Sequence, residues 1–226
     1  MQLFIDLEAH PDLSTGAMQR YIDAVEAPGQ YKKPESIAEW KAQNADSIGR
    51  EQWARSALDP MAGGIYVIGY NIDGGQGGAF TRNPREPEGP FLQAALSALA
   101  TMISKEGQPR SPRWVGFNHI NFDLPYLAKR CAILGVNPAL KIPTGSRYNN
   151  ERVLDIMQAW CGYKEFVSQK ALAKAMGLPQ DPSDIDGKDL WSAVEKGGVK
   201  VAEEKCRKDI ETLMNIYSRM APVFGF

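Results

Sequence analysis

Cysteine and histidine are scarce in this chain of 226 residues, which limits the kinds of site it can build. Three cysteines, Cys131, Cys161 and Cys206, lie far apart in the sequence, and their number is odd. This arrangement is typical of reduced core thiols and does not fit a disulfide framework or a zinc knuckle. The chain has only two histidines, His10 and His119, which are too few for a metal site built mainly on histidine ligands.

Long hydrophobic runs and a strong net charge are missing as well. No apolar run approaches the roughly 20 residues that a helix needs to span a bilayer, so we expect no membrane partner. The formal net charge is −1, which excludes the global basic field of many nucleic-acid-binding proteins. Any nucleic acid must therefore be held by local contacts.

No basic region or cleavage site precedes the first apolar residues, and we expect a cytoplasmic protein.

The length and composition predict one α/β domain spanning residues 1–226. Apolar and β-branched runs predict strands at residues 2–8, 65–70, 79–81 and 114–117 of a mixed sheet. Helical periodicity predicts helices at about residues 91–103, 122–134, 154–161, 168–176, 188–195 and 199–221. Residues 9–61 contain two further helical stretches, 35–41 and 51–54, and we interpret them as a helical insertion after the first strand.

The first strand carries two carboxylates where a buried strand is expected to be apolar. Asp6 and Glu8 are separated by one residue, and because strand side chains alternate between faces, both emerge on the same face. Two adjacent buried carboxylates repel each other and are costly to bury unpaired. They favour hard divalent cations, although the polar end of an ordinary strand gives the same pattern.

Two further aspartates lie in patterned segments downstream. Asp123 begins the helix that follows the strand ending near Phe117, a position where an aspartate can also serve as a helix cap. Asp209 borders the apolar stripe of the last helix, which is formed by Cys206, Ile210, Leu213, Tyr217 and Met220. Its side chain can therefore point toward the sheet, and a solvated helix carboxylate is the alternative.

In this order, the three segments resemble the exonuclease motifs of the DEDD, or DnaQ-like, proofreading superfamily. The motifs are Asp6-x-Glu8, Asn118-x-x-x-Phe122-Asp123 and Asp209. The chain resembles most the stand-alone exonucleases related to the proofreading domain of family B DNA polymerases. Further segments also fall where that family has them, namely Ala57-Leu58-Asp59-Pro60, Phe122-Asp123-Leu124-Pro125, Asp155, the Asp186-Gly187 turn and Cys206.

The resemblance implies a ribonuclease H-like α/β fold with a mixed five-stranded sheet flanked by helices, and removal of nucleotides from DNA 3′ ends. Electrostatics supports a metal-dependent nuclease independently of the resemblance. A phosphodiester and its attacking nucleophile are both anionic, so clustered carboxylates would repel them unless metal ions were present. Two Mg²⁺ or Mn²⁺ ions can activate water and stabilise the leaving 3′ oxygen. We therefore hypothesise that Asp6, Glu8, Asp123 and Asp209 hold two divalent cations.

The sequence departs from the family pattern beside the last aspartate. Members of the family carry a tyrosine four residues before that aspartate or a histidine five residues before it, whereas this chain has Lys205 and Glu204. Lys205 lies one helical turn before Asp209 and can reach the same site. A lysine is a poor general base at neutral pH, so we expect it to position water or phosphate. An ordinary surface salt bridge with Asp209 is the alternative.

Five further residues are candidates for contact with the substrate. By resemblance, Asn118 contacts the substrate or a metal-bound water. His119 faces the cleft or is a hydrogen-bonded structural histidine. Phe122 and Leu7 can wedge against the terminal bases, or they belong to the core. Asp155 contacts the substrate, caps a helix or supports a residue that does.

Together these features predict a 3′–5′ exodeoxyribonuclease that acts on single-stranded DNA 3′ ends and releases nucleoside monophosphates. It would serve DNA repair, recombination or replication, with a replication or recombination protein as an expected partner. Two alternatives remain open at this point. The first is a weakened exonuclease-like protein that binds DNA ends, which retention of all four acidic residues argues against. The second is an RNA-trimming enzyme of the same superfamily, which only 2′-hydroxyl contacts would distinguish.

Overall fold

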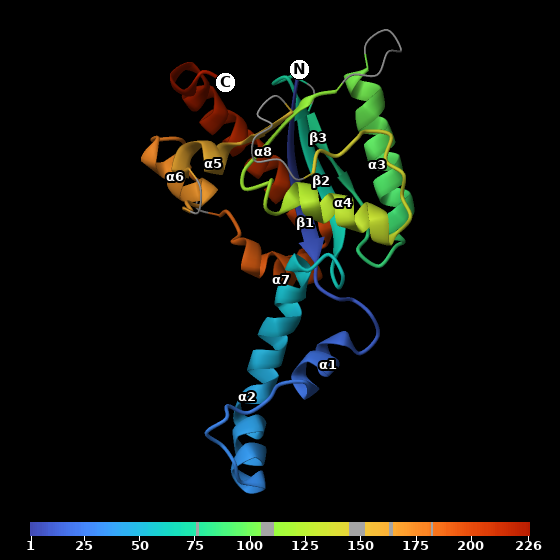
Figure 1. The fold of residues 1–226 in the computed structure, drawn as a ribbon, viewed down its shortest axis with the longest axis vertical. Coiled ribbons are helices and arrows are strands. Elements are labelled where there is room, and N and C mark those ends of the chain that lie inside the picture. Colours follow the sequence, from blue (N-terminus) through green and yellow to red (C-terminus); the bar gives the residue numbers. More distant parts are fainter. Residues whose placement is uncertain (76, 105–110, 145–151, 163–164, 182) are drawn as a thin grey trace. The chain divides into compact units, whose positions relative to one another are not determined.

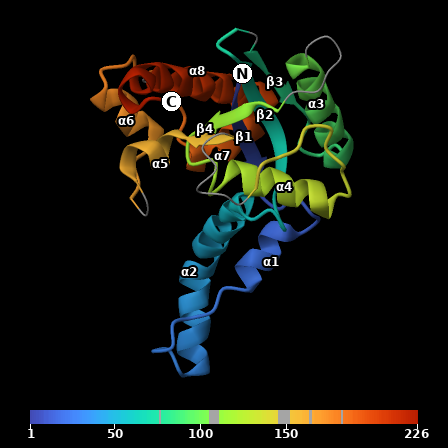
Figure 2. The same cartoon turned by 45° about the horizontal axis from the view of Figure 1, so that its top comes forward.

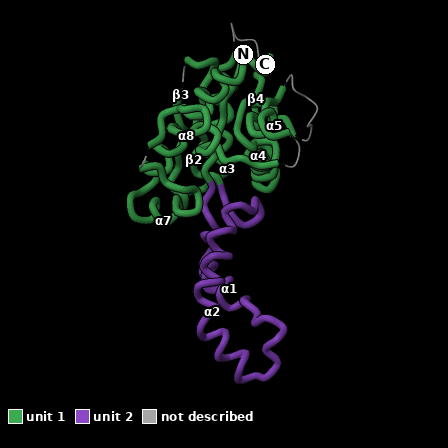
Figure 3. Tube along the Cα trace, turned by 90° about the vertical axis from the view of Figure 1, so that its left-hand side faces the viewer, with its two compact units in different colours: residues 1–8, 65–226 green, residues 9–64 purple. Residues whose placement is uncertain are grey.

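The computed structural model describes residues 1–75, 77–104, 111–144, 152–162, 165–181 and 183–226 (Figure 1). The described residues divide into two compact units, residues 1–8 with 65–226 and residues 9–64 (Figure 3). None of the described helices is long and apolar enough to cross a bilayer.

The larger unit is built on a mixed five-stranded sheet, which confirms the predicted fold class. Its strands are β1 (Gln2–His10), β2 (Gly64–Ile72), β3 (Gly77–Thr81), β4 (Arg113–Gly116) and β5 (Val153–Asp155). They are ordered β3-β2-β1-β4-β5, which makes β1 the central strand. Strands β1, β4 and β5 run parallel to one another, whereas β3 pairs antiparallel with β2. The helices of this unit are α3 (Glu88–Ile103), α4 (Asp123–Ile133), α5 (Ile156–Cys161), α6 (Gln169–Ala175), α7 (Gly187–Gly197) and α8 (Val199–Phe224).

Helix α8 covers one face of the sheet, and α3 and α4 lie over the other (Figures 1 and 2). The alternation along β1 places Leu3, Ile5 and Leu7 on one face, and all three are buried. Phe4 lies on the opposite face, in a core cluster with Ile210 of α8. The residues of α8 that are buried are Ala202, Cys206, Ile210, Leu213, Ile216 and Met220. This confirms four members of the predicted apolar stripe, whereas its fifth member, Tyr217, is only partly buried. Asp6 and Glu8 therefore belong to the face that α8 covers.

The structure corrects the prediction for residues 153–161. Helical periodicity suggested one helix from Leu154, but Val153–Asp155 form β5 and the helix α5 starts at Ile156. All three residues of β5 are buried, because the strand pairs with β4 inside the unit. A continuous apolar run of this length does not distinguish a buried strand from a buried helix.

The smaller unit, residues 9–64, holds α1 (Ala17–Asp23) and α2 (Pro34–Arg55). The sequence suggested two short helices where the structure has the single helix α2, and α1 was not predicted. Only Gly49 and Trp53 of α2 are buried, so no apolar stripe marks the length of the helix. A Cβ atom at Gly49 would lie 2.4 Å from the Cα of Ile22, so glycine there allows α1 and α2 to pack closely.

Candidate active site

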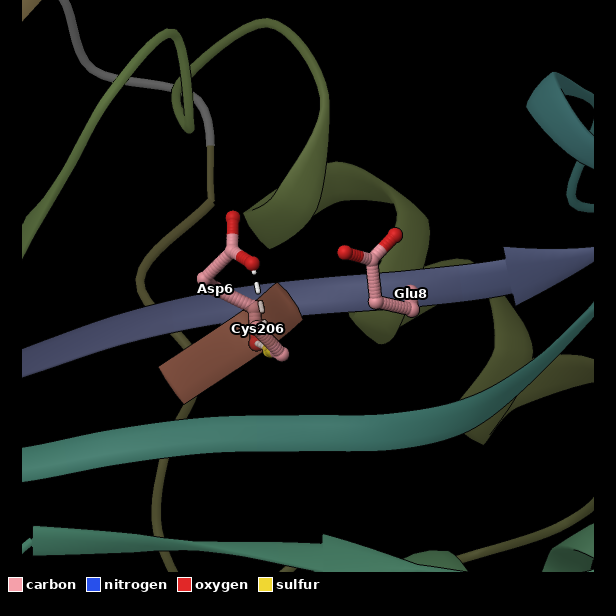
Figure 4. A group of neighbouring side chains, drawn as sticks. All are labelled: Asp6, Glu8 and Cys206. Atoms are coloured by element: carbon pink, nitrogen blue, oxygen red, sulfur yellow. Dashed lines mark hydrogen bonds between the residues drawn. The ribbon is translucent and has the colours of Figure 1, made fainter. Parts of the chain in front are cut away.

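Asp6 and Glu8 project from the same face of the central strand (Figure 4). A carboxylate oxygen of each residue lies within 4.8 Å of the other and of the Cys206 thiol on α8. The Cys206 Sγ donates a hydrogen bond to Asp6 Oδ2 at 3.1 Å. The predicted pair of adjacent carboxylates is thus present, and the last helix reaches it.

Helix α8 can come close to Asp6 and Glu8 because β2 has a glycine, Gly69, at the point where the helix crosses it. A Cβ atom at Gly69 would lie 2.6 Å from Cys206 Sγ and 3.2 Å from Cγ1 of Ile210. Only glycine therefore allows this close approach of helix to sheet. Cys206 itself was predicted as a core thiol, and its hydrogen bond to Asp6 was not foreseen. Its position three residues before Asp209 on the apolar stripe was the available signal.

Asp123 is placed at the start of α4 and is connected to β1 by a hydrogen bond. Its Oδ1 accepts a hydrogen bond from the backbone amide of Leu7 at 3.2 Å, and the residue is 5% exposed. Burial is the main reason that the pKa of Asp123 is raised well above its usual value, and the charges of Asp6 and Glu8 raise it further. A helix cap on its own does not explain a carboxylate that accepts a hydrogen bond from a strand amide and interacts with the charges of Asp6 and Glu8.

Asp209 is connected to the pair through Lys205. The Lys205 ammonium donates a hydrogen bond to Asp209 Oδ2 and lies 3.4 Å from Glu8 Oε1. The exposed fraction of the side chain is 13% for Lys205, 12% for Glu8 and 25% for Asp209. Lys205 is therefore no ordinary surface lysine, because it is mostly buried and contacts carboxylates from two different elements.

Asp6, Glu8, Asp123 and Asp209, hereafter the acidic cluster, influence one another strongly. Burial raises the pKa of Asp6 to about 7, and the charge of Asp209 adds to this effect. Burial likewise raises the pKa of Glu8 to about 8, while Lys205 acts in the opposite direction. Burial is also the main reason that the pKa of Asp209 is raised. Such a set of buried and partly buried oxygen donors that repel one another fits hard divalent cations, which remove the repulsion.

These pKa shifts predict a stability that falls with pH when divalent ions are removed. Folded Asp6 and Glu8 keep protons up to about pH 7 and 8, whereas unfolded carboxyl groups lose them near pH 4. Between pH 7 and 8 the folded chain therefore binds more protons, and the free energy of unfolding should fall by about 1 kcal/mol. Buried His119, whose pKa is lowered to about 3, changes this result by only about 0.1 kcal/mol, because unfolded histidine is already mostly neutral at pH 7.

Urea denaturation in EDTA at pH 7 and pH 8 measures this effect. The double variant Asp6→Asn, Glu8→Gln is the control, and its stability should change much less over the same interval. An equal fall in the control would assign the effect to other groups.

Asp155 is held by backbone amides on both of its oxygens. Its Oδ1 accepts hydrogen bonds from Asn118 at 3.0 Å and Gln158 at 3.2 Å, and its Oδ2 accepts one from Ile120 at 3.1 Å. The residue is 4% exposed. This geometry favours the cap alternative, in which Asp155 is the N-cap residue of α5 and fixes the turn at residues 118–120.

The other candidates for substrate contact differ in their exposure. His119 is fully buried against Gly116, where a Cβ atom would lie 2.4 Å from the imidazole Nδ1, so the structural alternative is favoured. Leu7 is 6% exposed, which favours core packing. Phe122 is partly exposed with its ring centroid 5.3 Å from that of Tyr126. Asn118 is also partly exposed and has a φ of 58°, a left-handed conformation that asparagine tolerates well.

A cleft of about 470 Å³ opens beside Asp209, between α6, residues 179–181 with Asp184, and α8. The side-chain amide of Gln169 donates a hydrogen bond to the Asp209 carbonyl oxygen at 2.7 Å. Lys170 and Asp184, which also line the cleft, form an ion pair at 3.6 Å. The cleft gives solvent access to the Asp209 side of the acidic cluster.

A comparison with curated proteins gives no match, whereas a family model and solved structures match this chain. The structure of the family B DNA polymerase from the hyperthermophilic archaeon Pyrobaculum calidifontis matches with a TM-score of 0.62 and 14% sequence identity. The match covers 98% of this chain and 24% of the polymerase chain, so this chain spans about a quarter of the polymerase's length. At this identity the likeness establishes the fold, which is the predicted ribonuclease H-like α/β fold.

The family model matches residues 97–225, more than half of the chain. The matched segment contains Asp123, Lys205 and Asp209 and begins after the strand that carries Asp6 and Glu8. The chain therefore belongs to the family described as predicted 3′–5′ exonucleases related to the exonuclease domain of PolB.

Proposed function

We propose that this protein is a metal-dependent 3′–5′ exonuclease that hydrolyses DNA from its 3′ ends and releases nucleoside monophosphates. The family implies an exonuclease, hence a hydrolase with a nucleic-acid substrate, and exonucleases of the DEDD kind use divalent metals. DNA as the substrate, the preference for single strands and the two-metal mechanism are the further parts of the proposal. Roles in DNA repair, replication or recombination, with protein partners from these processes, follow from the same activity.

The observation that supports the proposal is that carboxylates from three distant segments are linked at β1, since Asp123 accepts the Leu7 amide and Lys205 joins Asp209 to Glu8. Asp6 and Glu8 come from β1, Asp123 from α4 and Asp209 from α8. Folding alone does not favour such a cluster, because burial raises the pKa of each member and repulsion from other members raises those of Asp6, Glu8 and Asp123 further. A binding protein would gain nothing from keeping these groups together. This supports a catalytic site over a scaffold that only holds DNA ends.

The acidic cluster would hold two divalent cations, Mg²⁺ or Mn²⁺. When bound, the ions would activate the attacking water and stabilise the leaving 3′ oxygen. The backbone amide of Leu7 holds Asp123, and the Cys206 thiol holds Asp6, so two of the ligands are fixed by hydrogen bonds. Such fixed ligands are pre-oriented for the ions.

Other residues of this chain would position the substrate. Lys205, which lies among the carboxylates, supplies a cationic group that can orient water or the scissile phosphate. The partly exposed Asn118 and Phe122 are the members of the predicted contact set with surface available to the terminal nucleotide. Asp155 and His119 would act indirectly, by fixing the turn that carries Asn118.

One assay tests the proposal. Single-stranded and duplex DNA and single-stranded RNA, each labelled at the 5′ or the 3′ end, are incubated with the protein in Mg²⁺, Mn²⁺ or EDTA. We expect 5′-labelled single-stranded DNA to give a ladder that shortens with time, 3′-labelled DNA to release a labelled mononucleotide at once, and EDTA to stop both. Faster cleavage of RNA would support the exoribonuclease alternative. DNA binding without cleavage in either metal would contradict the proposal.

A further inference from the structure

The Lys205 ammonium contacts two members of the acidic cluster that come from different elements. It donates a hydrogen bond to Asp209 Oδ2 on its own helix and lies 3.4 Å from Glu8 Oε1 on β1. The Glu8 Oε1 atom is buried and accepts no hydrogen bond from any described residue, so this ion pair is its compensation. The ammonium therefore lies between two carboxylates that the proposed function assigns to metal binding.

We propose that Lys205 is an internal cation that competes with one of the two divalent ions for Glu8 and Asp209. That ion binds by displacing the ammonium from both carboxylates. The inference rests on the proposed function, because it requires Glu8 and Asp209 to be metal ligands.

The competition follows from the chemistry of the shared oxygen atoms. A divalent cation needs lone pairs of the carboxylate oxygens, and Lys205 engages the Asp209 Oδ2 and neutralises the Glu8 Oε1. Two cations at the same oxygens also repel each other. Because lysine carries its charge on a flexible four-carbon stem, the ammonium can leave the carboxylates without any movement of α8.

Displacement would have two consequences for the site. In the absence of the ion, the ammonium offsets part of the repulsion within the acidic cluster and holds β1 and α8 together. After displacement, the ammonium is free beside the metal site, where it can contact the phosphate of the substrate. Tyrosine or histidine, the residues expected near this point from the family pattern, would not supply a permanent positive charge of this kind at neutral pH.

Metal-binding measurements on Lys205→Met test this inference independently of activity. Methionine has a similar length and high helix propensity but no charge. Mn²⁺ binding is measured by calorimetry and by electron paramagnetic resonance, without DNA. We expect wild-type protein to bind one Mn²⁺ ion tightly and a second weakly, and Lys205→Met to bind the second at least about tenfold more tightly.

Two further variants separate displacement from a general loss of positive charge. Lys208 is on the same helix and pairs with Asp181 and Glu204, away from Glu8, so Lys208→Met should leave Mn²⁺ affinity within about twofold. Lys205→Arg retains a cation and should keep the second affinity weak. If Lys208→Met strengthens Mn²⁺ binding as much as Lys205→Met does, or if neither changes it, the inference is wrong.

Thermal melting adds a readout that also controls for folding. In EDTA, Lys205→Met should melt at least about 5 °C below wild type, and saturating Mn²⁺ should raise its melting temperature more than that of wild type. Lys205→Gln provides a second neutral variant if the methionine variant does not fold. One result would overturn this inference and leave the proposed function intact. In that case the wild type binds Mn²⁺ and cleaves DNA, but both neutral variants bind Mn²⁺ with the same affinity as the wild type. Failure of wild type both to bind Mn²⁺ and to cleave DNA would overturn the proposed function as well.

Discussion

Replacement of Asp6 by alanine is expected to lower the rate of 3′-end cleavage at least about 10³-fold while the chain stays folded. Asp6 is the most connected member of the acidic cluster. Its carboxylate accepts a hydrogen bond from Cys206, and its charge interacts with those of Glu8, Asp123 and Asp209. The Asp6→Ala change therefore removes a carboxylate that interacts with each of the other three proposed ligands.

The fold should tolerate the Asp6→Ala change, because removal of a buried carboxylate also removes its desolvation and its repulsion of three neighbours. Initial rates on 5′-labelled single-stranded DNA in Mn²⁺, together with circular dichroism and thermal melting, measure both effects. Asp189→Ala is the matched control, since Asp189 is exposed on α7 and should leave the rate unchanged. An Asp6→Ala protein that cleaves within about tenfold of wild type would exclude Asp6 as a catalytic residue.

Glu88→Ala is expected to lower the free energy of unfolding by about 3–5 kcal/mol. Glu88 is 8% exposed at the start of α3, and its two carboxylate oxygens accept hydrogen bonds from Arg130 at 3.1 and 2.6 Å. Its Oε1 also accepts the backbone amide of Ile65 at 2.9 Å, and Arg82 lies 3.8 Å away. The network joins α3, α4 and the start of β2.

Alanine at position 88 would remove the carboxylate that faces the buried guanidinium groups of Arg82 and Arg130, and removal of one partner from a buried ion pair is strongly destabilising. Urea denaturation at pH 7 gives the free energy of unfolding. Glu86→Ala is the control, because Glu86 is an exposed glutamate two residues earlier and its loss should change stability by less than about 0.5 kcal/mol. A loss below about 1 kcal/mol for Glu88→Ala would show that the network contributes little to stability.

The sequence predicted the parts of the site that depend on local pattern. Because strand side chains alternate, Asp6 and Glu8 had to share a face once residues 2–8 were recognised as a strand. The position of Asp209 beside the apolar stripe of α8 likewise required only helical periodicity. The central sheet was predictable in type for the same reason, although β5 was mistaken for part of a helix because it has only three residues.

What the sequence did not predict depends on contacts between distant segments. The contact of Lys205 with Glu8 arises because α8 crosses the sheet close to β1, and that closeness depends on Gly69 in β2. The hydrogen bonds that the Asp155 carboxylate accepts from the backbone amides of residues 118 and 120 likewise join segments that are far apart in the sequence. The sequence did not predict α2 as a single helix, because this helix has no continuous buried face.

Crystals of the wild-type protein soaked in Mn²⁺ provide the most direct test that the acidic cluster binds catalytic metal ions. We expect anomalous difference density for manganese bounded by the carboxylates of Asp6, Glu8, Asp123 and Asp209, with the Lys205 ammonium moved away from Glu8 and Asp209. Ordered carboxylates with no manganese among them, at a concentration of Mn²⁺ that supports DNA cleavage, would contradict this expectation.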